Sequence, residues 1–271
     1  MSRAAEEALQ VWERDARGFH GHRLRLAGVA LVLVIFYVVS WRLAGIDLER
    51  LVTGLPKLGH WLASAWPPKT DELPVFLLRM AETVAMAAIG TTVATLAAIP
   101  LALLASRNIT PFPRLYTPVR WVLNGLRGID AFVFALLFVA CVGLGPFAGV
   151  LGIALHTCGS AAKLIADYVE NAELAPLHAV QAAGAGRITA IAYALVPEIL
   201  PAVLSTTLYL FEFNVRASTV LGVVGAGGIG QELKSSVDLL DFQRLFTIIA
   251  VILVAVTVLD QLASWLRKRL V

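Results

Sequence analysis

The chain is poor in charged residues. Only 15% of its 271 residues are Asp, Glu, Lys or Arg, whereas 58% are hydrophobic. Soluble domains average about 25% charged and about 45–50% apolar residues. So few charges cannot cover the surface of a water-soluble fold of this length. The composition therefore predicts a polytopic membrane protein.

Several chemical motifs are absent as well. The two cysteines, Cys141 and Cys158, stand in separate apolar stretches, and without a C-x-x-C they indicate neither a redox pair nor a zinc site. No H-E-x-x-H and no phosphate-binding G-x-x-x-x-G-K-[ST] occurs. His156 and Ser160 lie one helical turn apart with no carboxylate close in sequence, so we interpret them as helix-packing residues. The sequence thus predicts no metal, no cofactor and no ATP hydrolysis by this chain.

Long uncharged stretches locate the membrane spans. A bilayer core needs about 20 mostly apolar helical residues. Prolines, glycine turns and charges divide the chain into expected helices over residues 25–43, 74–106, 118–143, 147–168, 200–224 and 244–265. The expected fold is therefore all-α, a polytopic membrane protein with about six transmembrane helices.

Basic residues are distributed unevenly between the loops. They gather in the N-terminal tail, in segments 107–127 and 163–199, and in Arg267-Lys268-Arg269. Because basic loops stay in the cytoplasm, both termini are expected there. The expected regions are a cytoplasmic tail over 1–25, a first span with an outer amphipathic helix at 46–66 within residues 26–72, and a membrane core over 73–271.

A charged pair is expected in the middle of the fifth span. Glu212 and Arg216 in LYLFEFNVRA are four residues apart with the acid first, the favourable order for a pair on one helix face. A charge at membrane depth faces a partner or a wet cavity. Two interpretations stay open: a self-neutralised structural pair, or a pair that lines a substrate path with Asn214 and Ser218 as neutral donors.

A glycine-rich stretch, VGAGGIGQEL at residues 224–233, follows that span. Gly225, Gly227 and Gly230 spell the dinucleotide-binding pattern G-x-G-x-x-G, which needs a strand before it and an acid about 20 residues further on. Residues 248–251 are instead Ile-Ile-Ala-Val. An integral-membrane oxidoreductase using NAD(P) is thus the alternative. We favour the interpretation that these glycines, with Gly228, let helices or a re-entrant turn pack closely. A second interpretation is that the loop leaves backbone amides free to bind an anion.

The segment between the fourth and fifth spans, residues 178–197, reads HAVQAAGAGRITAIAYALVP. Its small residues let another backbone come close, which suits docking into the groove of a partner. Pro197 breaks or kinks helices, so a short cytoplasmic helix, a break and then the next span are expected.

This segment resembles a signature of ABC importer permeases: Glu-Ala-Ala, three residues, Gly, nine residues, then Ile-x-Leu-Pro. Ala179, Gly184 and Pro197 fall at the Ala, Gly and Pro positions, whereas His178 stands at the Glu position. The stretches AAIPLALLASRN, ALLFVACVGLGPFAGVLGIAL and LYLFEFNVRASTVLGVVGAGGIG look like the phosphonate-type branch. Asp130 follows Ile129 where that family has Pro-Glu, which is a departure.

The resemblance implies a type I permease fold in a bacterial inner membrane, with ligand handed over by a periplasmic binding protein. Two permease copies would form the path, and two ATPases, which bind ATP and Mg, would dock on the coupling loop 170–197. The ligand would be a small phosphorus oxyanion, a phosphonate or a phosphite- or phosphate-like anion. A permease for another small solute, a stand-alone channel and a secondary carrier are the alternatives; no nucleic acid is expected. The implied coupling residues are His178, Ala179, Gln181, Ala182, Gly184, Ala185, Arg187 and Pro197, and the path or gate residues are Glu212, Asn214, Arg216, Ser218, Gly225, Gly227, Gly228 and Gly230.

Overall fold

The computed structural model describes residue 26 and residues 28–270, and this part of the chain is helical without any strand. The expected tail, residues 1–25, lies outside the described residues. The described residues form two compact units, which divide between His60 and Trp61. Within the described part, four helices are long and apolar enough to cross a membrane, or up to six if each of two bent pairs is one span. The predicted all-α membrane fold is confirmed.

The first unit contains the helix Gly28–Leu43 and most of α2 (Leu48–Ser64), with a bend of 53° between them. Gly28–Leu43 is apolar on every face, which suits lipid all round. Asp47 starts α2, because its carboxylate accepts the backbone N–H groups of Glu49 and Arg50 at 3.0 and 3.2 Å. The amphipathic segment expected at 46–66 is therefore a helix.

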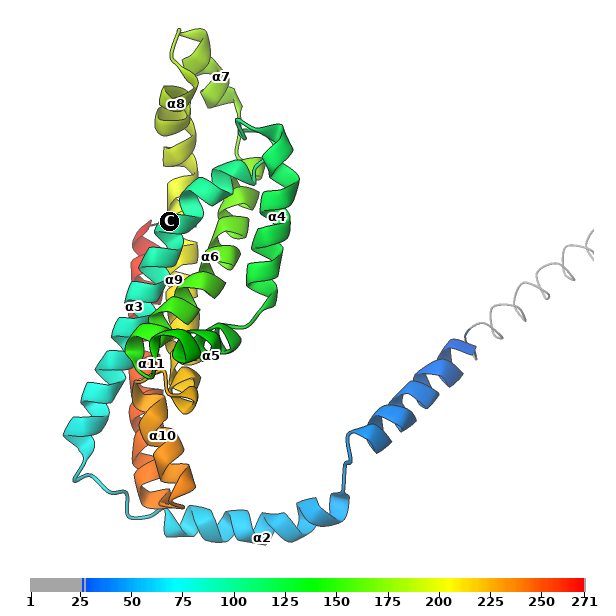
Figure 1. Ribbon diagram of the computed structural model, residues 1–271, viewed down its shortest axis with the longest axis vertical. Helices are drawn as coiled ribbons and strands as arrows, with labels where there is room; N and C mark the ends of the chain where they lie inside the picture. The colour runs from blue at the N-terminus through cyan, green and yellow to red at the C-terminus, as the bar shows by residue number, and fades with distance from the viewer. Residues whose placement is uncertain (1–25, 27, 271) are drawn as a thin grey trace, which may run out of the picture. The chain divides into compact units, whose positions relative to one another are not determined.

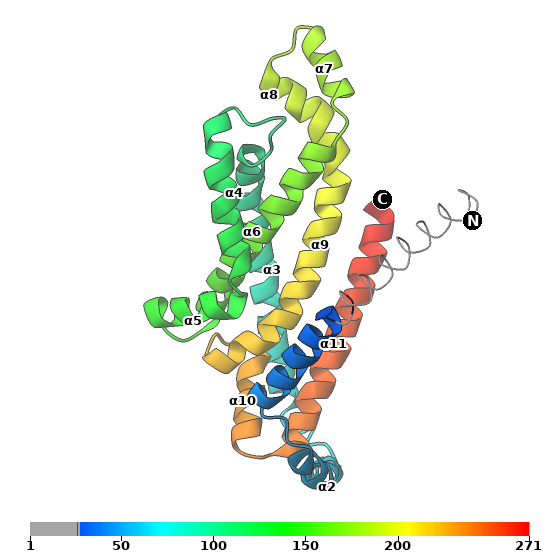
Figure 2. The same cartoon turned by 90° about the vertical axis from the view of Figure 1, so that its right-hand side faces the viewer.

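The second unit is a bundle around three long helices, which lie side by side (Figures 1 and 2): α3 (Leu73–Leu104), α6 (Pro146–Asn171) and α9 (Val196–Leu221). α4 (Pro113–Gly128) packs on α6, and α11 (Phe242–Leu270) packs on α9 and α3. The short helices α7 (Ala175–Ala182) and α8 (Arg187–Ala190) stand at one end, and α10 (Ile229–Asp238) stands at the other.

Small side chains bring α3 and α6 together. Ala98 and Ala102 of α3 and Ala162 of α6 are fully buried in one cluster. Gly90 lies so close to α6 that a Cβ there would be 2.8 Å from the Cγ2 atom of Ile153. Lipid is as apolar as these side chains, so close van der Waals contact, rather than water exclusion, holds such helices together.

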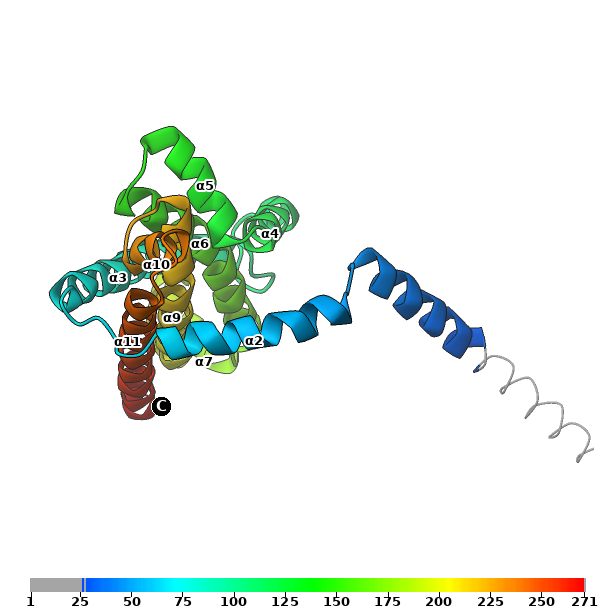
Figure 3. The ribbon, with the colours of Figure 1, turned by 90° about the horizontal axis from the view of Figure 1, so that it is seen from below.

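The expected continuous helix over 118–143 is wrong. The chain instead forms α4 and α5 (Ala131–Val142), which meet at an angle of 88°. Asp130 explains the new start, because its carboxylate accepts the backbone N–H of Phe132 at 2.8 Å and caps α5. α5 then lies across the outside of the bundle against α6, as the end-on view in Figure 3 shows.

The expected break at Pro197 is also wrong. Helix α8, a π-helical turn at Ile191–Leu195 and α9 follow one another without interruption, and Pro197 sits in the first turn of α9. The wider π turn accommodates the proline ring and its missing N–H donor. The true break lies at residues 183–186, where Gly184 has φ +90°. Segment 163–199 is not all loop either, since Lys163 lies inside α6.

Gly152 tests the contact between α5 and α6. A Cβ there would lie 2.8 Å from the backbone N of Ala135, so Gly152→Leu must push α5 away. Such overpacking costs about 1–3 kcal/mol, and each kcal/mol lowers the midpoint of thermal unfolding by roughly 2–4 °C in a chain of about this size. The matched control is Gly125→Leu, whose Cβ meets nothing within 4 Å. Equal midpoints for the two variants in detergent would contradict this account.

Candidate functional site

The predicted coupling residues gather at one end of the second unit. His178, Ala179, Gln181 and Ala182 belong to α7, Gly184 and Ala185 to the following turn, and Arg187 begins α8, whereas Pro197 lies further along the helix. His178, Ala179, Ala182 and Gly184 are exposed, and Leu177 anchors the helix in the core. α7 thus presents small exposed residues at the end of the bundle where Figure 1 shows this helix.

Arg187 fixes this end to the rest of the bundle. Its guanidinium donates hydrogen bonds to the carbonyls of Ile109 and Thr110, at 2.6 and 3.4 Å, just after α3 ends. Arg187 is thus a structural anchor as well as a loop residue. Two large exposed side chains beside it escaped the sequence reasoning: Ile188 is 84% and Tyr193 77% exposed. The sequence signal that could have found them is a large apolar residue in a segment otherwise expected to face water.

The glycine stretch connects a short 3-10 helix, η2 (Gly222–Val224), to α10, so it lacks the strand that a dinucleotide site needs. Gly225, Gly227 and Gly228 have φ values of 86°, 80° and 72°, a region that glycine enters without steric cost. A Cβ on Gly227 would lie 2.9 Å from both Glu82 of α3 and Pro146 of α6. The glycines therefore serve close packing, the interpretation favoured from the sequence.

The other two glycines and the loop amides support the same conclusion. A Cβ on Gly228 would meet the Thr83 hydroxyl, and one on Gly230 would meet the carbonyl of Thr219. The amide of Ile229 donates to Thr83 Oγ1 at 2.8 Å, and the amide of Ala226 donates to a carbonyl of the preceding helix. These two donors are therefore already used within the protein.

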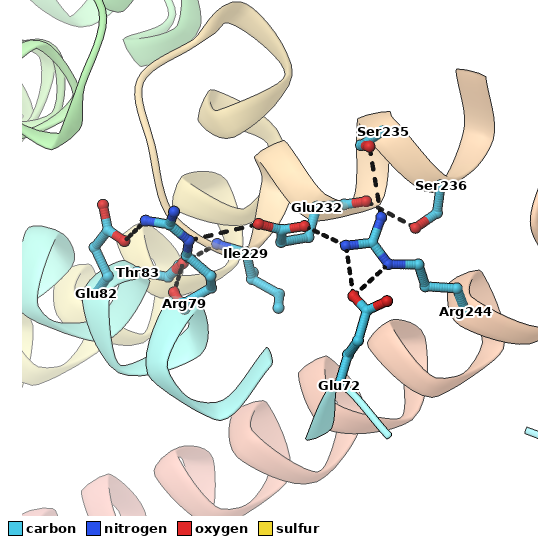
Figure 4. Close-up of polar contacts among 9 residues, drawn as sticks. All are labelled: Glu72, Arg79, Glu82, Thr83, Ile229, Glu232, Ser235, Ser236 and Arg244. Atoms are coloured by element: carbon cyan, nitrogen blue, oxygen red, sulfur yellow. Dashed lines mark hydrogen bonds and ion pairs between the residues drawn. The ribbon is translucent and has the colours of Figure 1, made fainter. Parts of the chain in front are cut away.

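Ion pairs hold α10 in place next to this loop (Figure 4). Arg79 of α3 contacts Glu82 at 2.8 Å and Glu232 of α10 at 3.5 Å. Arg244 of α11 contacts Glu232 at 2.6 Å and Glu72 at 2.9 Å. The sequence analysis does not predict this network, because most of its members are far apart along the chain. The network joins three helices at the end opposite α7.

A second ion pair at this end joins the segment before α3 to the residue before α11. Lys69 Nζ lies 2.6 Å from Asp241. Hydrogen bonding by Lys69, and then by the backbone amide of Arg244, lowers the pKa of the Asp241 carboxyl. A lowered carboxyl pKa adds stability above the ordinary value, and that stability is lost as the pH falls through the lowered value. The contact is therefore present at neutral pH.

The predicted pair between Glu212 and Arg216 does not form. Arg216 contacts Asp260 of α11 at 3.2 Å, and Glu212, 7% exposed, contacts Arg267 of α11 at 2.6 Å. Each side chain finds a closer partner on the neighbouring helix than four residues along its own. The two charges instead tie α9 to α11.

Asn214 and Ser218 are fully buried. The Asn214 amide donates to the hydroxyls of Thr91 and Thr157, at 2.8 and 3.0 Å, so it joins α9 to α3 and α6. The Ser218 hydroxyl donates to the Asn214 carbonyl at 2.6 Å. Both residues are satisfied inside the protein, which favours a structural role over contact with a transported ligand.

Residues 98–271 match the family described as the binding-protein-dependent transport system inner membrane component. The chain belongs to this family. It is a multi-pass permease of the inner membrane, and membership implies ATPase and binding-protein partners. The oxidoreductase alternative is not favoured.

Relatives of known name extend the comparison. This permease is 35% identical to the phosphite transport system permease protein PtxC of Stutzerimonas stutzeri, over 97% of this chain and 96% of PtxC. It is 44% identical to HtxC of the same organism, provisionally named a phosphite transport permease, over 90% of this chain and 87% of HtxC. The phosphate-import permease protein PhnE of Mycolicibacterium smegmatis is 39% identical over 92% of this chain and 47% of PhnE. The resemblance to phosphonate-type permeases is confirmed.

Solved structures support the fold. The inward-facing MetNI methionine ABC transporter has a chain with a TM-score of 0.66 and 19% identity, which covers 75% of this permease and 100% of that chain. The predicted type I permease fold is therefore confirmed.

The Arg216 contact can be tested with a pair of variants. Arg216→Ala leaves the Asp260 carboxylate unpaired inside a span, where an unpaired charge is costly. We expect a loss of about 1 kcal/mol, or roughly 2–4 °C in the midpoint of thermal unfolding. Arg216→Ala combined with Asp260→Ala should recover most of it, because no charge is left without a partner. An unchanged midpoint in the single variant would show that the contact adds nothing.

Proposed function

We propose that this permease carries a small phosphorus oxyanion, a phosphonate or a phosphite- or phosphate-like anion, from a periplasmic binding protein into the cytoplasm. The observation behind this proposal is that relatives covering almost the whole chain are named for phosphite transport. Separate ATPase subunits, which bind ATP and Mg, supply the energy. The permease itself has no cofactor and performs no covalent chemistry.

The α7 end is the cytoplasmic docking surface for the ATPases in this proposal. Its support is the exposed, small-residue face of α7 and the matching signature positions Ala179 and Gly184. The basic residues of the C-terminus favour the same orientation, with both termini in the cytoplasm. A second copy of the chain completes the path, so the permease acts as a homodimer. The glycine loop and α10 then form part of the outer gate.

Transport in proteoliposomes tests the substrate. The permease, assembled with its ATPase and binding-protein partners, should accumulate phosphite, methylphosphonate or phosphate only when ATP is inside with the ATPase. Methionine serves as the comparison solute. Uptake of methionine without uptake of any phosphorus oxyanion would assign the permease to another small solute.

Gly184 tests the docking surface. A Cβ at Gly184 meets nothing within 4 Å, so the side chain of Gly184→Trp has space in this chain but projects into a docked partner. We expect co-purified ATPase to fall about 10-fold or more, equivalent to about 1.4 kcal/mol, with normal membrane insertion. Because φ at Gly184 is +90°, Gly184→Ala controls for backbone strain and should retain most of the ATPase. Full retention by Gly184→Trp, or equal loss in both variants, would contradict docking at this residue.

A further inference from the structure

The contact between α4 and α6 has a regular antiparallel register. Near the α7 end, Arg120 contacts Glu170 at 2.9 Å. Further along, the Lys163 ammonium donates to Asn124 Oδ1 at 3.1 Å. The contact ends where a ring nitrogen of His156 hydrogen-bonds the carbonyl of Ile129 at 2.8 Å. We call this the α4–α6 seam, and its polar members are Arg120, Asn124, Arg127, His156, Ser160, Lys163 and Glu170.

The seam reaches the middle of a membrane span. A Cβ on Gly159 would lie 2.9 Å from the backbone N of Arg127, so α4 packs directly on α6 there. Gly159 stands at the middle of the 26 residues of α6. His156, Ser160 and Lys163 flank that point within about one helical turn. This group of polar side chains therefore lies within a helix that is long and apolar enough to cross a membrane.

The charges of the seam are paired at its end but not at its middle. Arg120 has a carboxylate partner, whereas Arg127 and Lys163 form no ion pair with any described residue. The nearby Asp130 carboxylate already accepts the Phe132 amide. This contrasts with α9, whose Glu212 and Arg216 are both paired. Positive charge is thus in excess along the middle of the seam.

These side chains are not enclosed within the single chain. Asn124 and Arg127 are exposed, and His156, Ser160 and Lys163 are partly exposed. Hydrocarbon cannot solvate them, and a charged side chain inside a membrane is costly unless it faces a partner or water. The outer face of α11 differs, because Leu253 and Val254 are 65% and 63% exposed and suit lipid. The seam must therefore face water or another protein surface.

We propose that the α4–α6 seam lines the inner half of the oxyanion path, with Arg127 and Lys163 supplying its positive charge. This proposal rests on the proposed function. The guanidinium can hold an oxyanion with two parallel hydrogen bonds, and the ammonium acts as a point charge. Asn124, His156 and Ser160 add neutral donors about one turn apart, so the anion passes between weak sites rather than entering one deep trap.

Transport by the reconstituted complex, using phosphite as the probe, tests the two cations. Arg127→Gln and Lys163→Gln should each lower uptake about 10-fold or more, while binding-protein-stimulated ATP hydrolysis stays within about twofold of the unmodified complex. Arg114→Gln, on the same helix but outside the seam, is the matched control and should leave uptake unchanged. Unchanged uptake in both seam variants would overturn the proposal.

A labelling experiment separates this proposal from the choice of substrate. In the assembled complex, with Cys141→Ala and Cys158→Ala, Ser160→Cys should react with the water-soluble anionic reagent methanethiosulfonate ethylsulfonate, and faster than with a cationic analogue. Leu253→Cys, on the lipid-facing side of α11, should not react. An unreactive Ser160→Cys means that protein covers the seam and overturns the proposal. Absence of all phosphorus-oxyanion uptake by the unmodified complex, with Ser160→Cys reactive, would instead overturn only the substrate.

Discussion

Hydrocarbon cannot form hydrogen bonds, and most of this structure follows from that constraint. Each polar group at membrane depth needs a protein partner or water. Asn214 hydrogen-bonds to hydroxyls on two neighbouring helices, and Glu212 forms an ion pair with Arg267. The same contacts that satisfy these groups also set which helices are neighbours. Apolar contacts alone would permit many arrangements of the helices. The polar contacts therefore specify which arrangement forms.

Small residues act together with this constraint. Gly90 and Gly152 let neighbouring helices approach until backbone and side-chain atoms touch. In the glycine loop the same property allows a non-helical segment to lie between α3 and α6, with the amides of Ala226 and Ile229 bonded to protein. Irregular backbone at such a depth is stable only where protein or water surrounds it. The loop thus resembles a nucleotide-binding motif in sequence while serving a packing role.

The sequence could predict the features that depend on long uncharged stretches: the membrane class, the approximate spans and the segment between two spans that contains α7. It could not predict the bend at Asp130, because a cap and a mid-span charge look alike in one dimension. The partner of Arg216 was missed for another reason, since Asp260 is 44 residues away and only tertiary contact brings it close. Arg244 and Glu232 likewise have no local signal. The break expected at Pro197 was wrong because a π-helical turn before it accommodates the proline, and hydrophobic periodicity does not reveal such a turn.

The two contacts between α9 and α11 also have an electrical consequence. Glu212 with Arg267, and Arg216 with Asp260, each sum to zero charge. A membrane potential does work of about 2.3 kcal/mol per elementary charge per 100 mV on charge that crosses it. These four side chains carry no net charge. The field therefore does no net work on them when the two helices move together. These four side chains therefore do not couple movement of the two helices to the voltage across the membrane.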